Sequence, residues 1–501
     1  MRGKRAVRNI YTNIILQITL AVSGLIIPKF ILSVYGSTVN GAVSSITQFI
    51  TYAALIEMGI GNASIVALYK PIAENDTESI NAIVTSSKKM YNHSGVAYIL
   101  VMLFLAGIYP LLVRGQLEYS FLFILVLCIG SVNAIDYFVL SKYKVFLIAD
   151  QKYYVLNIIR ATATVVLTVG SLFLIYFNIS VIGVKILAVF THLGEAVFVY
   201  VYIKRKYGWL NYKSDAHFKI RQRWNALIHQ LCATIVYNTD LVVLTLCLKA
   251  RSLVVVSVYT VYNLAASTIT NITSTLTTGI NASFGNMLAK RENSLVSDTF
   301  RIYEFVYFII LFILYTSFAV LILPFVVCYT NGISDGNYIR WEYGILFALA
   351  GLTAQIKEVS GVIINAAGHY RQTQRYALEE AVINIVLSLI LVWPYGISGV
   401  LLATVVSHVW MDIRYMNYVR KALLHGTGKR TLFRLGRNMA LFLFMTVIGM
   451  LKMSLDTNWL VWVGQAIVTT SITTVGFIIV NCCSEWETAK QIFGMIRKKR
   501  L

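Results

Sequence analysis

Apolar residues along this chain are gathered in blocks of about twenty, and short polar segments rich in Lys and Arg separate the blocks. A block of this length spans the hydrocarbon core of a bilayer as one α-helix, because a helix satisfies its backbone hydrogen bonds internally. The pattern predicts fourteen such helices, at residues 10–34, 42–68, 91–113, 119–141, 155–177, 180–203, 224–248, 253–288, 302–323, 341–364, 376–394, 396–418, 436–455 and 459–482. The expected fold class is therefore an all-α integral membrane protein.

The composition supports a membrane protein and excludes a soluble multidomain one. Of the 501 residues 57% are hydrophobic and only 13% are charged. The charged fraction is about half of what an ordinary soluble protein carries. Only five prolines occur, so the helices are rarely interrupted.

The distribution of basic residues predicts how the helices are oriented. With the N-terminus placed in the cytoplasm, most of the 43 Lys and Arg residues fall in the termini and in every second loop. The loops on the other side contain only Arg114, Lys249, Arg251 and Arg340. Both termini are therefore predicted to be cytoplasmic. The net charge of +21 is then explained by attraction to anionic membrane lipids, with no nucleic acid as partner.

A short internal repeat predicts how the helices are grouped. The tripeptide Asn-Ala-Ser occurs at 62–64 and again at 281–283, each time near a predicted cytoplasmic exit and six spans apart. Because both copies run in the same direction, they indicate parallel repeats, an arrangement suited to alternating access. The predicted domains are an N-terminal lobe of six helices (1–205), a basic linker (206–223), a C-terminal lobe of six helices (224–420), and two further helices with a basic tail (421–501).

The sequence contains none of the motifs that mark a soluble catalytic head. There is no P-loop, no Gly-x-Ser-x-Gly and no spacing of Cys and His residues typical of a metal site. The longest external loop, from about Leu323 to Arg340, is too short to form a catalytic domain. We therefore expect a secondary transporter, flippase or channel that is not an enzyme, with no cofactor and no assigned metal.

Five stretches of the chain resemble a known family of membrane proteins. They begin at Pro28 (PKFILSVYGSTVNGAVSSITQFITYAALIEMGIGNASIVALYKPIAEND), Ala149 (ADQKYYVLNIIR), Tyr237 (YNTDLVVLT), Ala282 (ASFGNMLAKRE) and Gly361 (GVIINAAGHYRQTQRYALEEAVINIVLSLILV). Together they run over residues 28–420 and resemble polysaccharide flippases of the O-antigen or teichoic-acid type. These flippases belong to the multidrug/oligosaccharidyl-lipid/polysaccharide exporter (MOP) superfamily.

The resemblance implies a fold, a substrate and a location. The fold would have fourteen helices in two lobes around a central cavity, and the location would be a prokaryotic plasma membrane. The substrate would be a polyprenyl-pyrophosphate-linked oligosaccharide, moved from the cytoplasmic to the outer leaflet for surface polysaccharide synthesis. Glycosyltransferases and a glycan polymerase would be its partners. The alternatives are a cation-coupled multidrug exporter of the same superfamily, a membrane glycan polymerase, or a scaffold of the glycan machinery.

Basic residues inside predicted spans are candidates for contact with substrate phosphates, because each costs about 2.5–3.5 kcal/mol on insertion scales. The candidates are Lys29, Arg160 and Lys357. For Lys29 and Arg160 the alternative is a side chain that extends to the nearer membrane surface. Lys357 lies deeper in its span, where such an extension to the surface is harder, and it is the strongest of the three candidates.

Glu57 is an acidic residue within the apolar second span. Gly59 and Gly61 follow it and would let a neighbouring helix approach closely. The carboxylate could accept hydrogen bonds or form an ion pair across a helix pair. Alternatively, it could take up a proton during transport.

The resemblance to the flippases also implies a cation site, for H⁺ or Na⁺, in the second lobe. The positions that could form it are Asp240, Glu380 and Asn384. Glu380 and Asn384 are four residues apart and therefore lie on one helix face. The alternative for Glu380 is stabilisation by the positive end of its own helix, without any ion.

Overall fold

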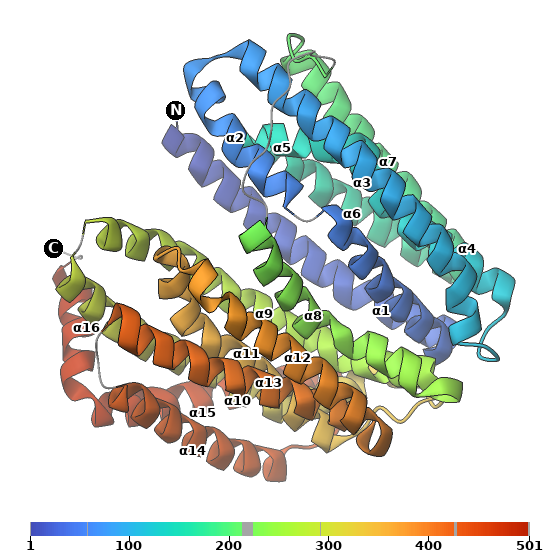
Figure 1. The fold of residues 1–501 in the computed structure, drawn as a ribbon. Coiled ribbons are helices and arrows are strands. Elements are labelled where there is room, and N and C mark those ends of the chain that lie inside the picture. Colours follow the sequence, from blue (N-terminus) through green and yellow to red (C-terminus); the bar gives the residue numbers. More distant parts are fainter. Residues whose placement is uncertain (1, 58, 213–223, 291, 425–427, 499–501) are drawn as a thin grey trace. The chain divides into compact units, whose positions relative to one another are not determined.

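The computed structural model describes residues 2–57, 59–212, 224–290, 292–424 and 428–498, and within these ranges it contains helices and no strand (Figure 1). Twelve of the described helices are long and apolar enough to cross a membrane. One of the twelve, α1 (Arg2–Ala53), contains two helices that meet at a kink. The described apolar part of α8, Leu231–Cys247, is shorter and corresponds to the seventh predicted span. The predicted class, an all-α membrane protein with about fourteen spans, is confirmed.

The chain divides into two compact units. Unit 1 consists of Met1–Thr234 and Leu244–Ser257, and unit 2 consists of Ile235–Val243 and Val258–Leu501. The predicted linker at 206–223 lies largely outside the described residues, so the predicted lobe boundaries stay a prediction.

Unit 1 is a bundle of apolar helices around an aromatic core. Neighbours in the bundle include α1 with α6, α6 with α7, α7 with α4, and α4 with α3. The rings of Tyr98 and Tyr137 lie 5.1 Å apart in the core with their planes tilted by 31°, and the Tyr98 hydroxyl donates to the Gly130 carbonyl. Its other elements are α2 (Ile60–Glu74), α3 (Thr77–Leu112), α4 (Tyr119–Ile135), the π-helix η2 (Asp136–Leu140), α5 (Ser141–Ala149), α6 (Tyr153–Tyr176) and α7 (Val181–Lys206).

Two glycines interrupt the first spans of unit 1. Gly36, within α1, has φ 81° and ψ 173°, and Gly59, before α2, has φ 87°. Side chains other than glycine rarely adopt such values, so both breaks depend on glycine. Pro28 also lies within α1, but the backbone stays helical there. Gly61 allows close approach as predicted, because a Cβ there would lie 3.1 Å from the Tyr91 hydroxyl.

Unit 2 is built around α11 (Trp341–Ala366), which packs against α10 and α13. In its membrane-spanning part 83% of the residues are buried, so α11 is covered by protein on most sides. The other helices of this part of the chain are α8 (Trp224–Cys247), α9 (Ser252–Ala289), α10 (Asn293–Tyr329), α12 (Tyr370–Tyr395), α13 (Ile397–Tyr418), α14 (Lys429–Lys452), α15 (Trp459–Ser484) and α16 (Trp486–Lys498).

A buried arginine ties the last helices to the rest of unit 2. Arg434 of α14 is completely buried and bonds to Glu304 of α10 at 2.6 Å. It also holds Glu485, at the end of α15, through two bonds of 2.8 and 2.6 Å. A buried arginine is tolerated only when its donors are satisfied, and its guanidinium donates a further bond to the Arg301 carbonyl.

Several helices are longer than the predicted spans. The helix α3 begins at Thr77, well before the predicted start at 91, and Asp76 caps it by accepting a hydrogen bond from the Ser79 backbone at 3.0 Å. Likewise α10 begins at Asn293 instead of 302. Hydropathy marks where a helix enters the hydrocarbon core, whereas polar helical turns continue beyond it.

Candidate functional site

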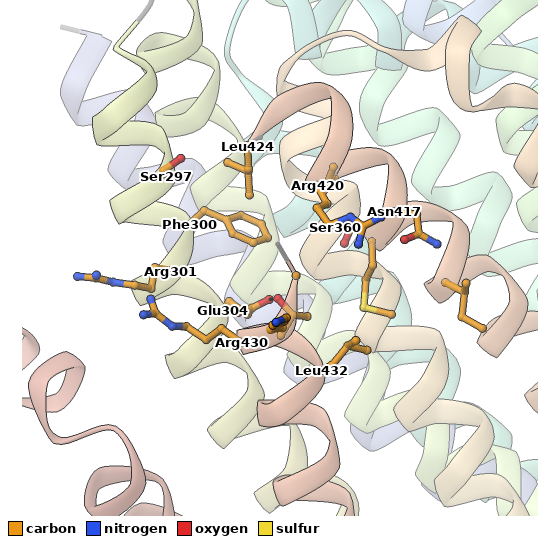
Figure 2. A pocket seen from close by; sticks show the side chains of 16 residues that line it. Ser297, Phe300, Arg301, Glu304, Ser360, Asn417, Arg420, Leu424, Arg430 and Leu432 are labelled. Atoms are coloured by element: carbon orange, nitrogen blue, oxygen red, sulfur yellow. Dashed lines mark hydrogen bonds between the residues drawn. The ribbon is translucent and has the colours of Figure 1, made fainter. Parts of the chain in front are cut away.

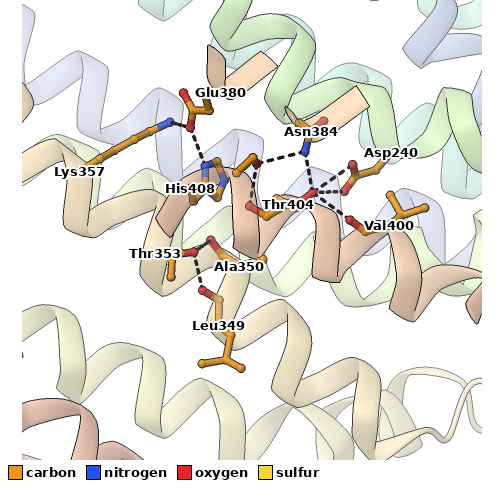
Figure 3. Close-up of polar contacts among 11 residues, drawn as sticks. Asp240, Leu349, Ala350, Thr353, Lys357, Glu380, Asn384, Val400, Thr404 and His408 are labelled. Atoms are coloured by element: carbon orange, nitrogen blue, oxygen red, sulfur yellow. Dashed lines mark hydrogen bonds and ion pairs between the residues drawn. The ribbon is translucent and has the colours of Figure 1, made fainter. Parts of the chain in front are cut away.

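Three helices bring polar side chains together in the interior of unit 2. Asp240 lies on α8, Asn384 on α12 and Thr404 on α13 (Figure 3). The Thr404 hydroxyl oxygen lies 3.3 and 3.4 Å from the two carboxylate oxygens of Asp240. The Asn384 amide donates to the same hydroxyl at 3.1 Å. Two of the predicted cation-site residues, Asp240 and Asn384, are thus joined through Thr404. We call these three residues the Asp240 cluster.

The Asp240 cluster fits a small cation that prefers oxygen ligands. Besides the Asp240 carboxylate, it offers the Thr404 hydroxyl, which lies 3.1 Å from the Val400 carbonyl. The Asn384 Oδ1 and Ser388 Oγ atoms, both on α12, are buried without a hydrogen-bond partner among the described residues, which is costly unless another group engages them. A 180° turn of the Asn384 amide would bring its oxygen to Thr404. Hard cations select such carboxylate, carbonyl and hydroxyl oxygens.

Other contacts fix the position of the Asp240 carboxylate. The Tyr259 hydroxyl of α9 donates to it at 2.8 Å, and only 4% of Asp240 is exposed. Among the described residues no three His, Cys, Asp or Glu side chains are placed to share a metal ion. The cluster therefore differs from a transition-metal site, and its single carboxylate suits a monovalent ion or a proton.

Glu380 takes part in a second, separate set of contacts one helical turn from Asn384. Its carboxylate accepts a bond of 2.7 Å from the Lys357 ammonium of α11 and lies 2.8 Å from the His408 ring of α13. The Lys357 ammonium also lies 5.0 Å above the Tyr237 ring. Lys357, the candidate for contact with a substrate phosphate, is thus paired with Glu380, one of the candidates for the cation site.

The position of Glu380 along α12 decides between two explanations for its charge. The helix begins at Tyr370, so Glu380 lies about 15 Å along it. The field of a helix terminus extends over only the first turn. The alternative considered for Glu380, stabilisation by its own helix end, therefore does not apply, and Lys357 and His408 supply the stabilisation.

A double-mutant cycle should measure this buried pair. We expect Lys357→Met to destabilise the protein, because Glu380 would lose its main positive partner in a buried environment. Adding Glu380→Gln should recover part of that loss, with a coupling energy of about 0.5–3 kcal/mol. Thermal unfolding of the purified protein in detergent measures each variant. A double variant whose loss equals the sum of the two single losses would show that the pair is not coupled.

In unit 1 Glu57 lies in the short 3₁₀ turn η1 (Ala54–Glu57), between the end of α1 and the start of α2. Its carboxylate and the Tyr91 hydroxyl of α3 are hydrogen-bonded. Glu57 therefore contacts a neighbouring helix of its own unit. This arrangement agrees with the hydrogen-bonding interpretation, and the proton-coupling interpretation stays a prediction.

Unit 1 also contains a chain of ionisable residues that begins at the π-helix η2. Asp136 lies 2.7 Å from Lys144 and 3.2 Å from His192. The other ring nitrogen of His192 lies 3.2 Å from Glu195, and Glu195 lies 3.8 Å from Arg160. Arg160 is therefore already near a carboxylate. Lys29 belongs to the same unit and is half-buried in α1.

Several residues of these polar groups in unit 2 and unit 1 were not predicted from the sequence. Thr404 and His408 lie four residues apart on α13 and form a polar stripe within a predicted span, which is the signal that could have found them. Asp136 and Glu195 are acidic residues inside predicted spans and could have been found by the reasoning applied to Glu57. Nothing in the sequence indicated that Lys357 faces Glu380, because that depends on how two helices are rotated.

A cavity of about 590 Å³ lies in unit 2 where α14 begins, beside α10 and the end of α13 (Figure 2). Glu304 is the only acidic side chain among the described residues around it, and Arg434 already binds it. The cavity is thus rimmed by excess positive charge, the charge that the sequence predicts for the cytoplasmic side. Its basic lining residues are Arg301, Arg420, Lys429 and Arg430.

Comparisons with known proteins identify the fold. No protein-family model and no curated protein sequence matches the chain. The lipid II flippase MurJ, in an inward closed conformation, is similar with a TM-score of 0.66 at 13% identity, over 95% of this chain and 99% of that one. An inward-facing multidrug resistance transporter of the MATE family, within the MOP superfamily, matches with a TM-score of 0.61 at 13% identity, over 80% of this chain and 96% of that one.

A MOP superfamily transporter from Pyrococcus furiosus is also similar, with a TM-score of 0.58 at 14% identity, over 85% of this chain and 97% of that one. At these identities the likeness concerns the fold. It agrees with the superfamily that the sequence resembles and leaves the polysaccharide-flippase branch as a prediction. This multi-pass membrane protein therefore has the fold of the MOP superfamily transporters.

Proposed function

We propose that this protein is a secondary transporter that flips a polyprenyl-pyrophosphate-linked oligosaccharide from the cytoplasmic to the outer leaflet, by alternating access. The observation that carries the proposal is the extent of the structural match. The match to the lipid II flippase covers 95% of this chain, whereas the matches to two MATE structures, one of them the multidrug resistance transporter, cover 80% and 83%. A lipid-linked substrate is thereby favoured over a soluble drug. Surface polysaccharide synthesis would provide the glycosyltransferases and the polymerase as partners.

The basic candidates offer this substrate the charges that it needs. A pyrophosphate cannot cross hydrocarbon unaided, and Lys29, Arg160 and Lys357 are the proposed contacts. In the conformation described, Arg160 lies near Glu195 and Lys357 is bonded to Glu380. A substrate phosphate would therefore replace a carboxylate at each of these two residues.

The Asp240 cluster is the proposed coupling site, for Na⁺ or H⁺. Asp240 supplies the negative charge, and Asn384 and Thr404 supply neutral oxygens. Glu380 would act through its partner Lys357, since its contacts are with Lys357 and His408. Glu57 is the proposed proton-binding residue of unit 1.

A vesicle assay tests the proposed function. The purified protein is reconstituted with a polyprenyl-pyrophosphate-linked oligosaccharide, and a glycosidase outside the vesicles reports which glycans are accessible. We expect the protein to expose glycans that protein-free vesicles keep inside, and a Na⁺ or H⁺ gradient to change the rate. Efflux of a cationic dye with no movement of glycan would instead identify a multidrug exporter. Growth of the glycan chain would identify a polymerase.

A further inference from the structure

Two cavities on unit 1 join into one groove along α6 and α7. One has a volume of about 660 Å³ and lies at the cytoplasmic ends of these helices, and the other, of about 460 Å³, continues toward the membrane interior. They share Ile158, Ile159 and Phe198, so they form one continuous surface, which we call the α6–α7 groove.

The cytoplasmic end of the α6–α7 groove is basic. Arg8 of α1 lies over the Tyr154 ring at 4.1 Å, and Arg205 and Lys206 line the same cavity from the last turn of α7. In the described part of the chain, none of these three basic residues has a carboxylate within ion-pair distance. Three positive charges are therefore available to a ligand at the membrane surface.

The acids near this end of unit 1 are already engaged. Asp150 lies 3.6 Å from Arg5 and 2.8 Å from Lys152. Deeper in the groove, Glu195 is paired with His192 and lies near Arg160. Neither carboxylate is free to neutralise the basic end of the groove.

The inner end of the α6–α7 groove is apolar and open. Val166 and Phe190 line it, and they are 54% and 65% exposed on the surface of unit 1. Gly194 forms part of its floor, and a Cβ added there would meet no atom within 4 Å. This part has room for a hydrocarbon chain.

The length of the groove matches one leaflet of a bilayer. From Phe190 to Arg205 the helix rises about 22 Å. Half of a bilayer with its head-group region measures about 20–22 Å. A lipid of the inner leaflet can therefore place its head at the basic end and its acyl chain against the apolar end.

From this geometry we propose that the α6–α7 groove binds one anionic phospholipid of the inner leaflet. Its phosphate accepts charge-assisted hydrogen bonds from Arg8, Arg205 and Lys206, and one acyl chain lies along α6 and α7 past Gly194. Basic pockets between transmembrane helices on the cytoplasmic side are suited to anionic lipid head groups. The apolar end distinguishes a lipid from soluble phosphate, which would need only the basic end.

Native mass spectrometry of the full-length protein in detergent tests the basic end. We expect phosphatidylglycerol to bind at least tenfold more tightly than phosphatidylethanolamine, because only the former has a net negative charge. The variant Arg8→Gln/Arg205→Gln/Lys206→Gln should lose that preference. The matched control, Lys70→Gln/Lys88→Gln/Lys89→Gln, removes three charges from α2 and α3 of the same unit and should bind like the wild type. Equal loss in both variants would show only general charge attraction and would overturn the proposal.

The variant Gly194→Leu tests the apolar end without changing any charge. It fills the open space above Gly194, and we expect phosphatidylglycerol binding to fall at least fivefold. Melting temperatures without added lipid should equal that of the wild type for every variant, which verifies folding. Undiminished phosphatidylglycerol binding by Gly194→Leu would overturn the proposal. So would binding of soluble glycerol 3-phosphate as tight as that of phosphatidylglycerol, because the ligand would then be a phosphate without a tail.

Discussion

Replacing Asp240 with Asn is expected to reduce the stimulation of transport by a cation gradient about tenfold or more, while the protein stays folded. Asp240 carries the only negative charge of its cluster, and the Asn side chain keeps the shape but loses that charge. The vesicle assay measures the loss under imposed Na⁺ and H⁺ gradients. A second measurement needs no transport: the melting temperature of the wild type should rise with Na⁺ concentration if Na⁺ is the ion, and that of the variant should not.

Two further variants test whether the effect of Asp240→Asn is specific to the Asp240 cluster. Asp298→Asn makes the same change at an acid of α10 whose side chain is 67% exposed, and should leave the gradient response intact. Thr404→Val removes one oxygen but keeps the charge, and should weaken the response less than Asp240→Asn does. If Asp240→Asn retains both the gradient response and any Na⁺-dependent shift of the melting temperature, the Asp240 cluster is not the coupling site.

Replacing Arg434 with Met is expected to destabilise the protein by about 3–5 kcal/mol, because Glu304 would remain buried without its cation. Thermal unfolding in detergent measures the effect. The exposed Arg430, four residues earlier on α14, provides the control, and Arg430→Met should change the melting temperature little. Addition of Glu304→Gln to Arg434→Met should recover part of the stability. No recovery would mean that packing, and not charge, explains the loss.

The ion pair of Arg434 with Glu485 should make the stability of the folded protein depend on pH. Partial burial opposes the charge of Glu485, but the hydrogen bonds and charge of Arg434 outweigh it and hold the pKa of Glu485 below its usual range. A carboxylate with a lowered pKa stabilises the folded state above its unfolded pKa of about 4.3, and that stability is lost as the pH falls through the folded pKa. Below this pH the wild type should therefore lose more stability than Arg434→Met does.

The sequence predicted the number and order of the spans because hydrocarbon imposes a length on every helix. It did not predict where helices end. The starts of α3 at Thr77 and α10 at Asn293 lie in polar turns, where hydropathy falls although the backbone remains helical. The sequence also did not predict that the first two spans meet at the single residue Gly36, because only the backbone angles of Gly36 reveal this kink.

For the site, the sequence predicted which residues are costly in a membrane but not their partners. The resemblance grouped Asp240 and Asn384 as a cation site, which stays a prediction, and in the structure Thr404 lies between these two residues. Lys357 and Glu380 were assigned to different roles, yet they form one pair. Such pairing depends on the rotation of each helix about its axis, which packing sets and which no local sequence pattern records.

The contacts of Arg434 bear on any attempt to shorten this protein. A chain cut after α13 would lose Arg434 and would leave Glu304 of α10 in the interior without a counter-charge. Such a deletion would therefore damage the part that it was meant to preserve. A minimal version limited to the first twelve spans should need Glu304→Gln, or an apolar residue at this position, before it can fold. The helices that follow α13 are in this sense an integral part of unit 2.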